Sequence, residues 1–263
     1  MKIITSLAAA AMLAAGVAGA QAAQIAALWG DNSISIVDTS GWKVVKTWKI
    51  EGVTGNVVGI DVRPADGMLY GLVADGSVVT IDTATGKATL KSKLETMLPA
   101  GTMATVDFNP VADRLRVIGS DGTSLRANVD DGKVTKDGSL KYAEADANKG
   151  KMPKVIAGAY ANSVKGAKDT TLYDIDATTG SLVRQAPPND GTLNTIGALG
   201  VSGDTGWSFD IWSDGMKNEA WLLGGTTVYK VDLASGKATE AGKVTGAQGA
   251  VRDMAILPGM KLS

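Results

Sequence analysis

The sequence predicts an all-β protein, a single five-bladed β-propeller closed by pairing of its N- and C-terminal strands. Three observations support this prediction. A short strand with a central aspartate recurs along the chain, the same two strand types follow most copies, and the two chain ends hold complementary parts of one blade. Asp61 and Asp107 are 46 residues apart, and Asp210 and Asp253 are 43 apart. A period in the forties is typical of a four-stranded propeller blade.

The first 22 residues have the features of a secretory signal peptide. Lys2 precedes an uncharged apolar run from Ile3 to Ala20, and Ala20-Gln21-Ala22 is a small-x-small cleavage site. The run is rich in Ala and Gly, which makes it a weak candidate for a membrane anchor. We therefore expect cleavage after Ala22, a propeller domain over residues 23–263, a periplasmic or secreted location, and no membrane insertion of the mature chain.

Each repeat begins with the aspartate-bearing strand, which we expect to be the innermost strand of its blade. A fifth copy, Val155–Tyr160, keeps the apolar strand and lacks the aspartate. The four copies with the aspartate are Gly59–Pro64, Thr105–Pro110, Ser208–Ile211 and Val251–Met254.

Two further elements follow the first strand in the repeats. One is a second apolar strand, such as Met68–Leu72 or Arg114–Ile118, and the other is an alternating strand such as Ser77–Asp82. The alternating strand ends in an Asp-x-x-x-Gly turn, in which glycine supplies a positive φ and aspartate binds backbone amides. Seven Asp-Gly pairs mark further hairpin turns, and no convincing long amphipathic helix interrupts the β pattern.

Counting the innermost strands gives five blades. The N-terminal piece holds only three strands, Gln24–Trp29, Ser33–Val37 and Lys43–Lys49, and the C-terminal segment Val251–Leu257 would supply its innermost strand. Such a closure leaves no unpaired sheet edge across the seam. Six blades are the alternative, with the poorly repeating segment Tyr142–Leu199 divided differently.

The composition excludes several classes of active site. The chain has no His and no Cys, so Ser-His-Asp and Cys-His nucleophile systems and His-ligated zinc are ruled out. Any acid-base or metal chemistry would depend on the abundant aspartates. A net charge of −1 without a basic stripe argues against nucleic acid as a partner.

Between Val106 and Val201 the sequence resembles a family of secreted bacterial β-propeller proteins catalogued as domain of unknown function 4394. The resemblance rests on the runs DFNPVADRLRVIGSDGTSLRANVDDG, TTLYDIDATTGSLVRQ and APPNDGTLNTIGALGV. It implies the propeller fold and export. It implies no activity, because the family offers no established catalytic residues to carry over, and we predict none.

The repeated aspartates are the candidate metal ligands. Equivalent positions on innermost strands would place carboxylates around the central axis, where a hard cation such as Ca²⁺ would relieve their repulsion. In the alternative reading, each aspartate binds backbone amides of the neighbouring blade and fixes the spacing of the blades. The set comprises Asp61, Asp107, Asp210 and Asp253.

Tryptophan and arginine provide the candidate ligand-binding residues. All six Trp lie in the first and last blades, where they could form a stacking platform or pack at the seam, and Trp207 and Trp212 flank Asp210. Arg63, Arg116 and Arg252 lie in or beside innermost strands, where they could receive an anionic ligand or pair with the axial aspartates.

The function favoured by these observations is a monomeric, exported, non-enzymatic binding module, with a small ligand or an envelope protein as its partner. One alternative is a glycoside hydrolase that uses aspartates of the innermost strands, because some propeller glycosidases place their carboxylates there. A second alternative is an envelope scaffold without a small ligand.

Overall fold

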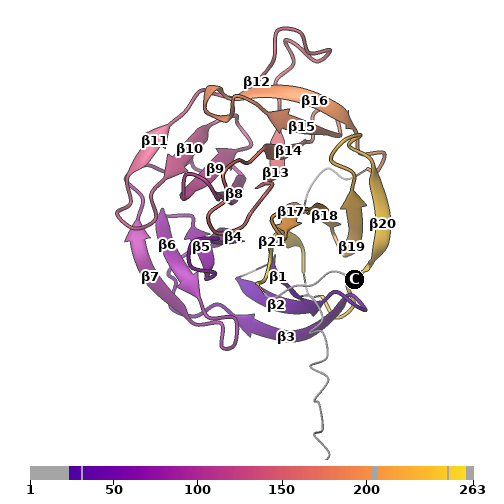
Figure 1. Ribbon diagram of the computed structural model, residues 1–263. Helices are drawn as coiled ribbons and strands as arrows, with labels where there is room; N and C mark the ends of the chain where they lie inside the picture. Colours follow the sequence, from indigo (N-terminus) through magenta and orange to yellow (C-terminus); the bar gives the residue numbers. More distant parts are fainter. Residues whose placement is uncertain (1–23, 31, 203–205, 248, 259–263) are drawn as a thin grey trace, which may run out of the picture.

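Five β-sheets surround a common axis and form the five blades of a propeller (Figure 1). The computed structural model describes residues 24–30, 32–202, 206–247 and 249–258, so the predicted signal peptide lies outside the described residues. The prediction of five blades is confirmed, and the six-blade alternative is wrong because the segment 141–198 contributes to a single sheet. Within the described ranges, no helix has the length and apolarity needed to cross a membrane.

We number the blades along the chain. Blade 1 consists of β1 (Gln24–Trp29), β2 (Ser33–Asp38), β3 (Lys43–Lys49) and β21 (Val251–Ile256). Blade 2 consists of β4 (Val57–Val62), β5 (Leu69–Val73), β6 (Ser77–Ile81) and β7 (Ala88–Lys93). Blade 3 consists of β8 (Ala104–Asn109), β9 (Arg114–Gly119), β10 (Ser124–Ala127) and β11 (Val134–Lys136).

Blade 4 is the longest and has a fifth strand at its outer edge. It consists of β13 (Val155–Tyr160), β14 (Leu172–Asp176), β15 (Ser181–Gln185), β16 (Thr192–Ala198) and β12 (Lys141–Tyr142), with a single 3₁₀ turn, η1 (Pro188–Asp190), before β16. Strand β12 pairs with β16 in parallel. Blade 5 consists of β17 (Trp207–Ser213), β18 (Asn218–Gly224), β19 (Thr227–Val231) and β20 (Ala238–Lys243).

The chain closes on itself in blade 1, as the sequence predicted. Strand β21 pairs antiparallel with β1, with Ala26 opposite Ala255 and Leu28 opposite Asp253. The innermost strands β21, β4, β8, β13 and β17 contact one another in this order, and β17 contacts β21 again. The ring is therefore complete, and the first and last strands of the fold lie in the same sheet (Figure 1).

The Asp-x-x-x-Gly turns hold neighbouring blades together at their outer strands. In the turn of blade 2, the Ala84 amide donates to Asp82 Oδ1 at 2.8 Å, and Gly86 has a φ of 77°. A Cβ at Gly86 would lie 2.5 Å from Trp48 Cβ and 2.8 Å from the Lys49 carbonyl oxygen in blade 1. Glycine is thus required here by both the backbone conformation and the close approach of the next blade.

The core lies between the blades, with one cluster of buried apolar residues for each of the five interfaces. Both faces of a blade are therefore packed, which explains why strands such as Leu69–Val73 are buried along their whole length. The interface between blades 3 and 4 has the fewest buried apolar residues, and it holds polar groups instead.

Arg116 is the centre of this polar interface. Its side chain is 2% exposed and donates to Asp137 Oδ2 at 2.5 Å, to the Tyr160 hydroxyl at 3.1 Å and to Asn189 Oδ1 at 2.8 Å. These partners lie in blade 3, in β13 and in η1, so one guanidinium joins blade 3 to blade 4. A buried arginine is acceptable when its donors are paired in this way.

Asp174 is a buried carboxyl in β14, opposite Gly158 in β13. Its two oxygens have no hydrogen-bond partner among the described residues, and a Cβ at Gly158 would lie 2.3 Å from Asp174 Oδ1. Burial raises the pKa of Asp174 to about 8, although the positive charge of Arg116 opposes this rise. The carboxyl is therefore expected to be mostly protonated at neutral pH in the folded protein.

Replacing Ala255 with proline tests the closure of the ring. Ala255 is fully buried in the middle of β21, opposite Ala26. Proline cannot donate to the sheet and leaves a buried carbonyl unpaired, so we expect Ala255→Pro to lower the free energy of unfolding by about 2 kcal/mol or more. Ala100→Pro, in an exposed turn, is the control. Equal urea midpoints for the two variants would contradict a closure through β21.

The raised pKa of Asp174 predicts that the folded protein becomes less stable as the pH rises. Its pKa is about 8 in the folded protein and close to 4 in the unfolded chain, so the folded state binds more protons between these values. The free energy of unfolding should therefore decrease as the pH rises from 5 to 7, and Asp174→Asn should remove up to about 1.4 kcal/mol per pH unit of that slope. Urea titrations at pH 5, 6 and 7 measure the slope. The exposed Asp131→Asn should leave it unchanged, and an unchanged slope in Asp174→Asn would contradict the assignment.

Candidate functional site

The innermost strands have one edge without a sheet partner, and this edge faces the axis. Each of these five strands is the terminal strand of its sheet, so alternate N–H groups along it have no carbonyl acceptor on a neighbouring strand of that sheet. Unpaired buried N–H groups are costly, and a side-chain acceptor can satisfy them. The repeated aspartates provide these acceptors.

Each aspartate of the repeat accepts an N–H from the next innermost strand. Asp61 in β4 accepts from Phe108 in β8 at 2.6 Å, and Asp107 in β8 accepts from Tyr160 in β13 at 2.9 Å. Asp210 in β17 accepts from Ile256 in β21 at 2.7 Å. Asp61 and Asp210 use their other oxygen for the amide of the residue that follows them. The aspartates thus connect neighbouring blades, as one of the two readings of the sequence predicted.

Asp253 lies in a different register from the other three. It accepts the amides of Ile60 and Met254, each at 2.9 Å, and the Ser208 hydroxyl at 3.2 Å. Because Asp210 binds the amide of Ile256, the position in β21 that matches Asp61 is Ala255, two residues beyond Asp253. The fifth innermost strand has Ala159 at this position, directly before Tyr160.

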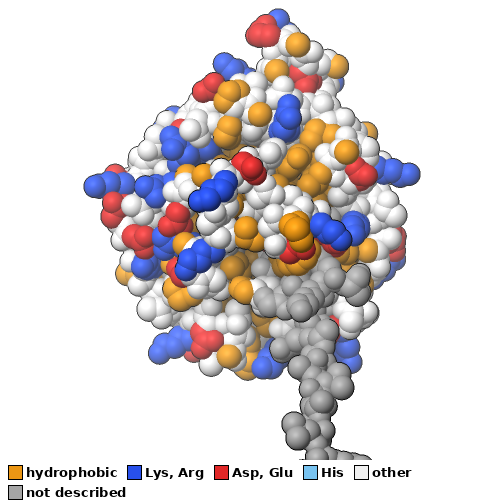
Figure 2. Space-filling model, in the orientation of Figure 1, with side chains coloured by type: hydrophobic (Ala, Val, Ile, Leu, Met, Phe, Trp, Pro, Cys, Tyr) orange, Lys and Arg blue, Asp and Glu red, His pale blue; other side chains and the backbone are white. Residues whose placement is uncertain are grey.

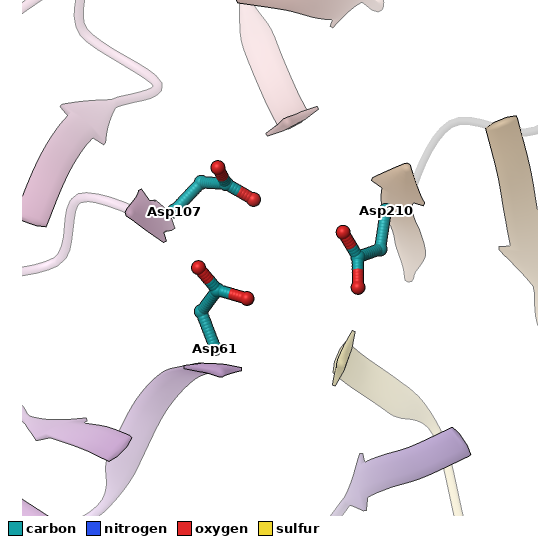
Figure 3. Close-up of side chains that lie close together, drawn as sticks. All are labelled: Asp61, Asp107 and Asp210. Atoms are coloured by element: carbon teal, nitrogen blue, oxygen red, sulfur yellow. The ribbon is translucent and has the colours of Figure 1, made fainter. Parts of the chain in front are cut away.

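Asp61, Asp107 and Asp210 form one cluster of carboxylates, and Asp253 is not part of it. One oxygen from each lies within 4.8 Å of the others, and all three side chains are buried. Figure 3 shows the three carboxylates directed from separate strands toward a shared space, which we call the aspartate cluster. Burial and mutual repulsion raise the pKa of Asp61 and Asp107 well above the usual range, and burial raises that of Asp210 to about 6.

Asp107 has an oxygen that the backbone does not use. Its Oδ1 accepts the Tyr160 amide, and Oδ2 has no hydrogen bond among the described residues. The oxygens of Asp61 and Asp210 accept one amide each and retain further lone pairs. The cluster can therefore offer several oxygen ligands to a hard cation, or it can share protons.

A cavity of about 320 Å³ opens onto the cluster at the end of the axis where the innermost strands finish. We call this opening the front mouth. Asp61 and Asp210 lie among its lining residues, and Trp212 and Ile211 line it as well. The loop 163–165 adds the exposed Lys165. The predicted site residue Trp212 is thus beside the aspartates.

The opposite end of the axis holds a second cavity, of about 300 Å³. We call it the back mouth, because the innermost strands begin there. Trp207 and Arg252, both predicted as ligand-binding residues, line this cavity together. Trp207 is stacked against Tyr229, with ring centroids 6.3 Å apart and an interplanar angle of 5°.

Arg63 and Arg116 lie in ion-pair networks between blades. Arg63 bonds to Asp113 at 2.6 Å and to Asp130 at 2.8 Å, and both partners belong to blade 3. Arg116 bonds to Asp137. Pairing of these arginines was one of the sequence-based expectations, but their partners are not the axial aspartates. The five predicted ligand-binding residues therefore divide into one at the front mouth, two at the back mouth and two in the interfaces.

Sequence reasoning missed the apolar residues of the back mouth. Val58 and Ile156 stand near the start of their innermost strands, and Thr102 and Met103 directly precede β8. Val58 lies three residues before Asp61, and Met103 lies four residues before Asp107. The signal available in the sequence was their common place in the repeat, at or before the first residues of the innermost strand.

On the face seen in Figure 2, the described side chains form no large patch of a single charge. Lys and Arg side chains are interspersed with Asp and Glu side chains on the face seen in Figure 2. This mixture agrees with the net charge of −1 of the whole chain. Specific recognition is therefore expected in the cavities, where shape and a few polar groups select the ligand.

Comparison with known proteins supports the fold and the family. The chain resembles a structural genomics protein of unknown function from Bacteroides thetaiotaomicron, with a TM-score of 0.55, 16% identity, and coverage of 91% of this chain and 66% of the other. It also resembles a chain of a nidogen/laminin complex, with a TM-score of 0.51, 12% identity, and coverage of 91% and 100%. No curated protein sequence matches it.

The sequence model of the family described as domain of unknown function DUF4394 matches residues 34–255. This match extends from β2 to β21 and includes strands of all five blades and every aspartate of the repeat. The chain therefore belongs to the DUF4394 family.

Proposed function

We propose that this protein is an exported, monomeric binding module that holds a divalent cation, Ca²⁺, on Asp61, Asp107 and Asp210. The observation that carries the proposal is the convergence of three buried carboxylates, with oxygens within 4.8 Å of one another, below an open cavity. The proposed export follows from the signal-peptide features of the first 22 residues.

Charge supports a cation at the cluster. Three carboxylates at this distance repel one another in a buried site, and either protonation or a cation must reduce the repulsion. Burial raises the pKa of all three carboxyls, and repulsion by neighbouring carboxylates raises the pKa of Asp61 and Asp107 further. No described lysine or arginine forms an ion pair with the three carboxylates, and Lys165 at the rim is exposed.

Ligand geometry supports a hard cation that keeps some water. Ca²⁺ takes 6–8 oxygen ligands, and three carboxylates provide only part of this number. The cavity of the front mouth gives room for waters or for oxygen atoms of a bound ligand. In this arrangement the backbone amides hold the carboxylates in place, and the cation would link the blades to the ligand.

The alternative of a glycoside hydrolase receives less support. Inverting glycosidases keep their two carboxyl groups roughly 6.5–9.5 Å apart to leave room for a water. The oxygens of the aspartate cluster are within 4.8 Å, and Asp61 and Asp210 each hold two backbone amides. Such anchored carboxylates are better placed to bind than to exchange protons with a sugar.

Calcium should stabilise the folded protein. After dialysis against a chelator, Ca²⁺ at about one hundred times its dissociation constant should add about 2.7 kcal/mol to the free energy of unfolding and raise the melting temperature by about 5–10 °C. Asp107→Asn should abolish this increase, because it removes one charge and can keep the bond from the Tyr160 amide. Differential scanning calorimetry and calcium titration measure the two effects.

Asp131→Asn, an exposed aspartate in a turn of blade 3, is the matched control and should respond to Ca²⁺ like the wild type. A wild-type melting temperature that is the same in chelator and in Ca²⁺, together with no metal in elemental analysis, would overturn the proposal. A response retained by Asp107→Asn would move the cation away from the aspartate cluster.

A further inference from the structure

The back mouth is a second site, separate from the aspartate cluster. It lies where the innermost strands begin, whereas the aspartates of the cluster stand three or four residues after the first residue of their strands. Its cavity of about 300 Å³ is at the lower limit of small-molecule sites. The lining residues are Val58, Thr102, Met103, Ala104, Ile156, Gly206, Trp207, Val251 and Arg252.

The walls of the back mouth are largely apolar. Val58, Ile156 and Val251 come from three different blades, and Trp207 from a fourth. Met103 stands at the opening and is 41% exposed. Trp207 is backed by Tyr229 and by the buried cluster between blades 4 and 5, so its position is fixed before any ligand arrives. A rigid aromatic wall in a concave apolar site is a common feature of small-molecule binding.

Among the described residues that line this cavity, Arg252 is the single charged side chain. Its Nη1 donates to the Val57 carbonyl at 2.8 Å. Among the described residues, no carboxylate lies within ion-pair distance of Arg252, whereas Arg63, Arg116 and Arg126 are all paired with aspartates. The neighbouring Asp253 uses its carboxylate for the amides of Ile60 and Met254.

An arginine without a counter-charge beside an apolar wall is suited to an anionic group. Guanidinium remains protonated at any physiological pH and presents planar donors that match a carboxylate. The bond to Val57 uses one of the five N–H donors and orients the head of the side chain. The remaining donors can bind two oxygens of a ligand whose apolar part lies against Trp207 and Ile156.

We propose that the back mouth binds a small amphipathic carboxylic acid, an acyl chain or ring that bears one carboxylate. Arg252 pairs with the carboxylate, and Val58, Ile156 and Trp207 contact the apolar part. This site does not depend on the cation at the front mouth. The protein thus has two chemically different openings on one axis, one for a cation and one for an organic anion.

Octanoate, octanol and octylammonium share one chain and differ in charge, so they test both parts of the proposal. Isothermal titration calorimetry of the full mature protein should show octanoate binding at least tenfold more tightly than octanol, and no binding of octylammonium. Arg252→Gln should weaken octanoate binding about 10–100-fold and leave octanol unchanged. Ile156→Asp should abolish binding of octanoate, because it places a like charge in the apolar wall.

The controls separate this proposal from the cation site and from misfolding. Arg184→Gln removes an exposed arginine of β15 and should bind octanoate like the wild type. Asp107→Asn should also bind octanoate normally, even if it loses its response to Ca²⁺. Circular dichroism and thermal melting establish that each variant is folded. Absence of octanoate binding to the wild type at millimolar concentration, or equal affinity of wild type and a folded Arg252→Gln, would overturn the proposal.

Discussion

The unpaired inner edge of the five blades is the constraint on which the centre of this molecule depends. Each blade ends toward the axis in a buried strand of which alternate N–H groups lack a sheet partner. Asp61, Asp107, Asp210 and Asp253 satisfy these donors across the gaps between blades. Three of them, Asp61, Asp107 and Asp210, converge in a buried space, so side chains that satisfy the backbone donors also form the proposed cation site.

Stability and function are distributed differently around the ring. Apolar clusters in all five interfaces supply the burial that keeps the ring closed, and closure through β21 leaves no blade incomplete. The interface between blades 3 and 4 departs from this scheme, with Arg116 at the centre of a paired network and Asp174 buried without a hydrogen-bond partner in the part of the chain that the structure describes. Burying a charged carboxyl in this way is costly, and protonation removes the charge. The stability of this interface is therefore expected to depend on pH.

The architecture could be predicted from the sequence because similar strand patterns recur from blade to blade. The spacing of the aspartates, the three-strand first blade and the unused last strand were sufficient to define five blades and the closing strand. The details of the site depend on register, which the sequence does not display. Asp253 resembled the other aspartates in its local sequence, yet Ala255 occupies the matching position. The partners of Arg63 come from blade 3, about 50 and 67 residues away, and no local pattern reports them. Asp174 lies in β14, the second strand of blade 4, and only its position opposite Gly158 explains how the carboxyl fits.

Alanine at 159 and 255 has a consequence for anything that binds on the axis. If all five innermost strands carried the same acid, a ligand on the axis could bind in five equivalent orientations related by rotation, and none would be preferred. Here, acids on two adjacent strands face a third acid that is flanked on either side by an alanine-bearing strand. Because the repeat is imperfect at these two positions, the axis lacks five-fold symmetry, and an asymmetric ligand bound there would have a single preferred orientation.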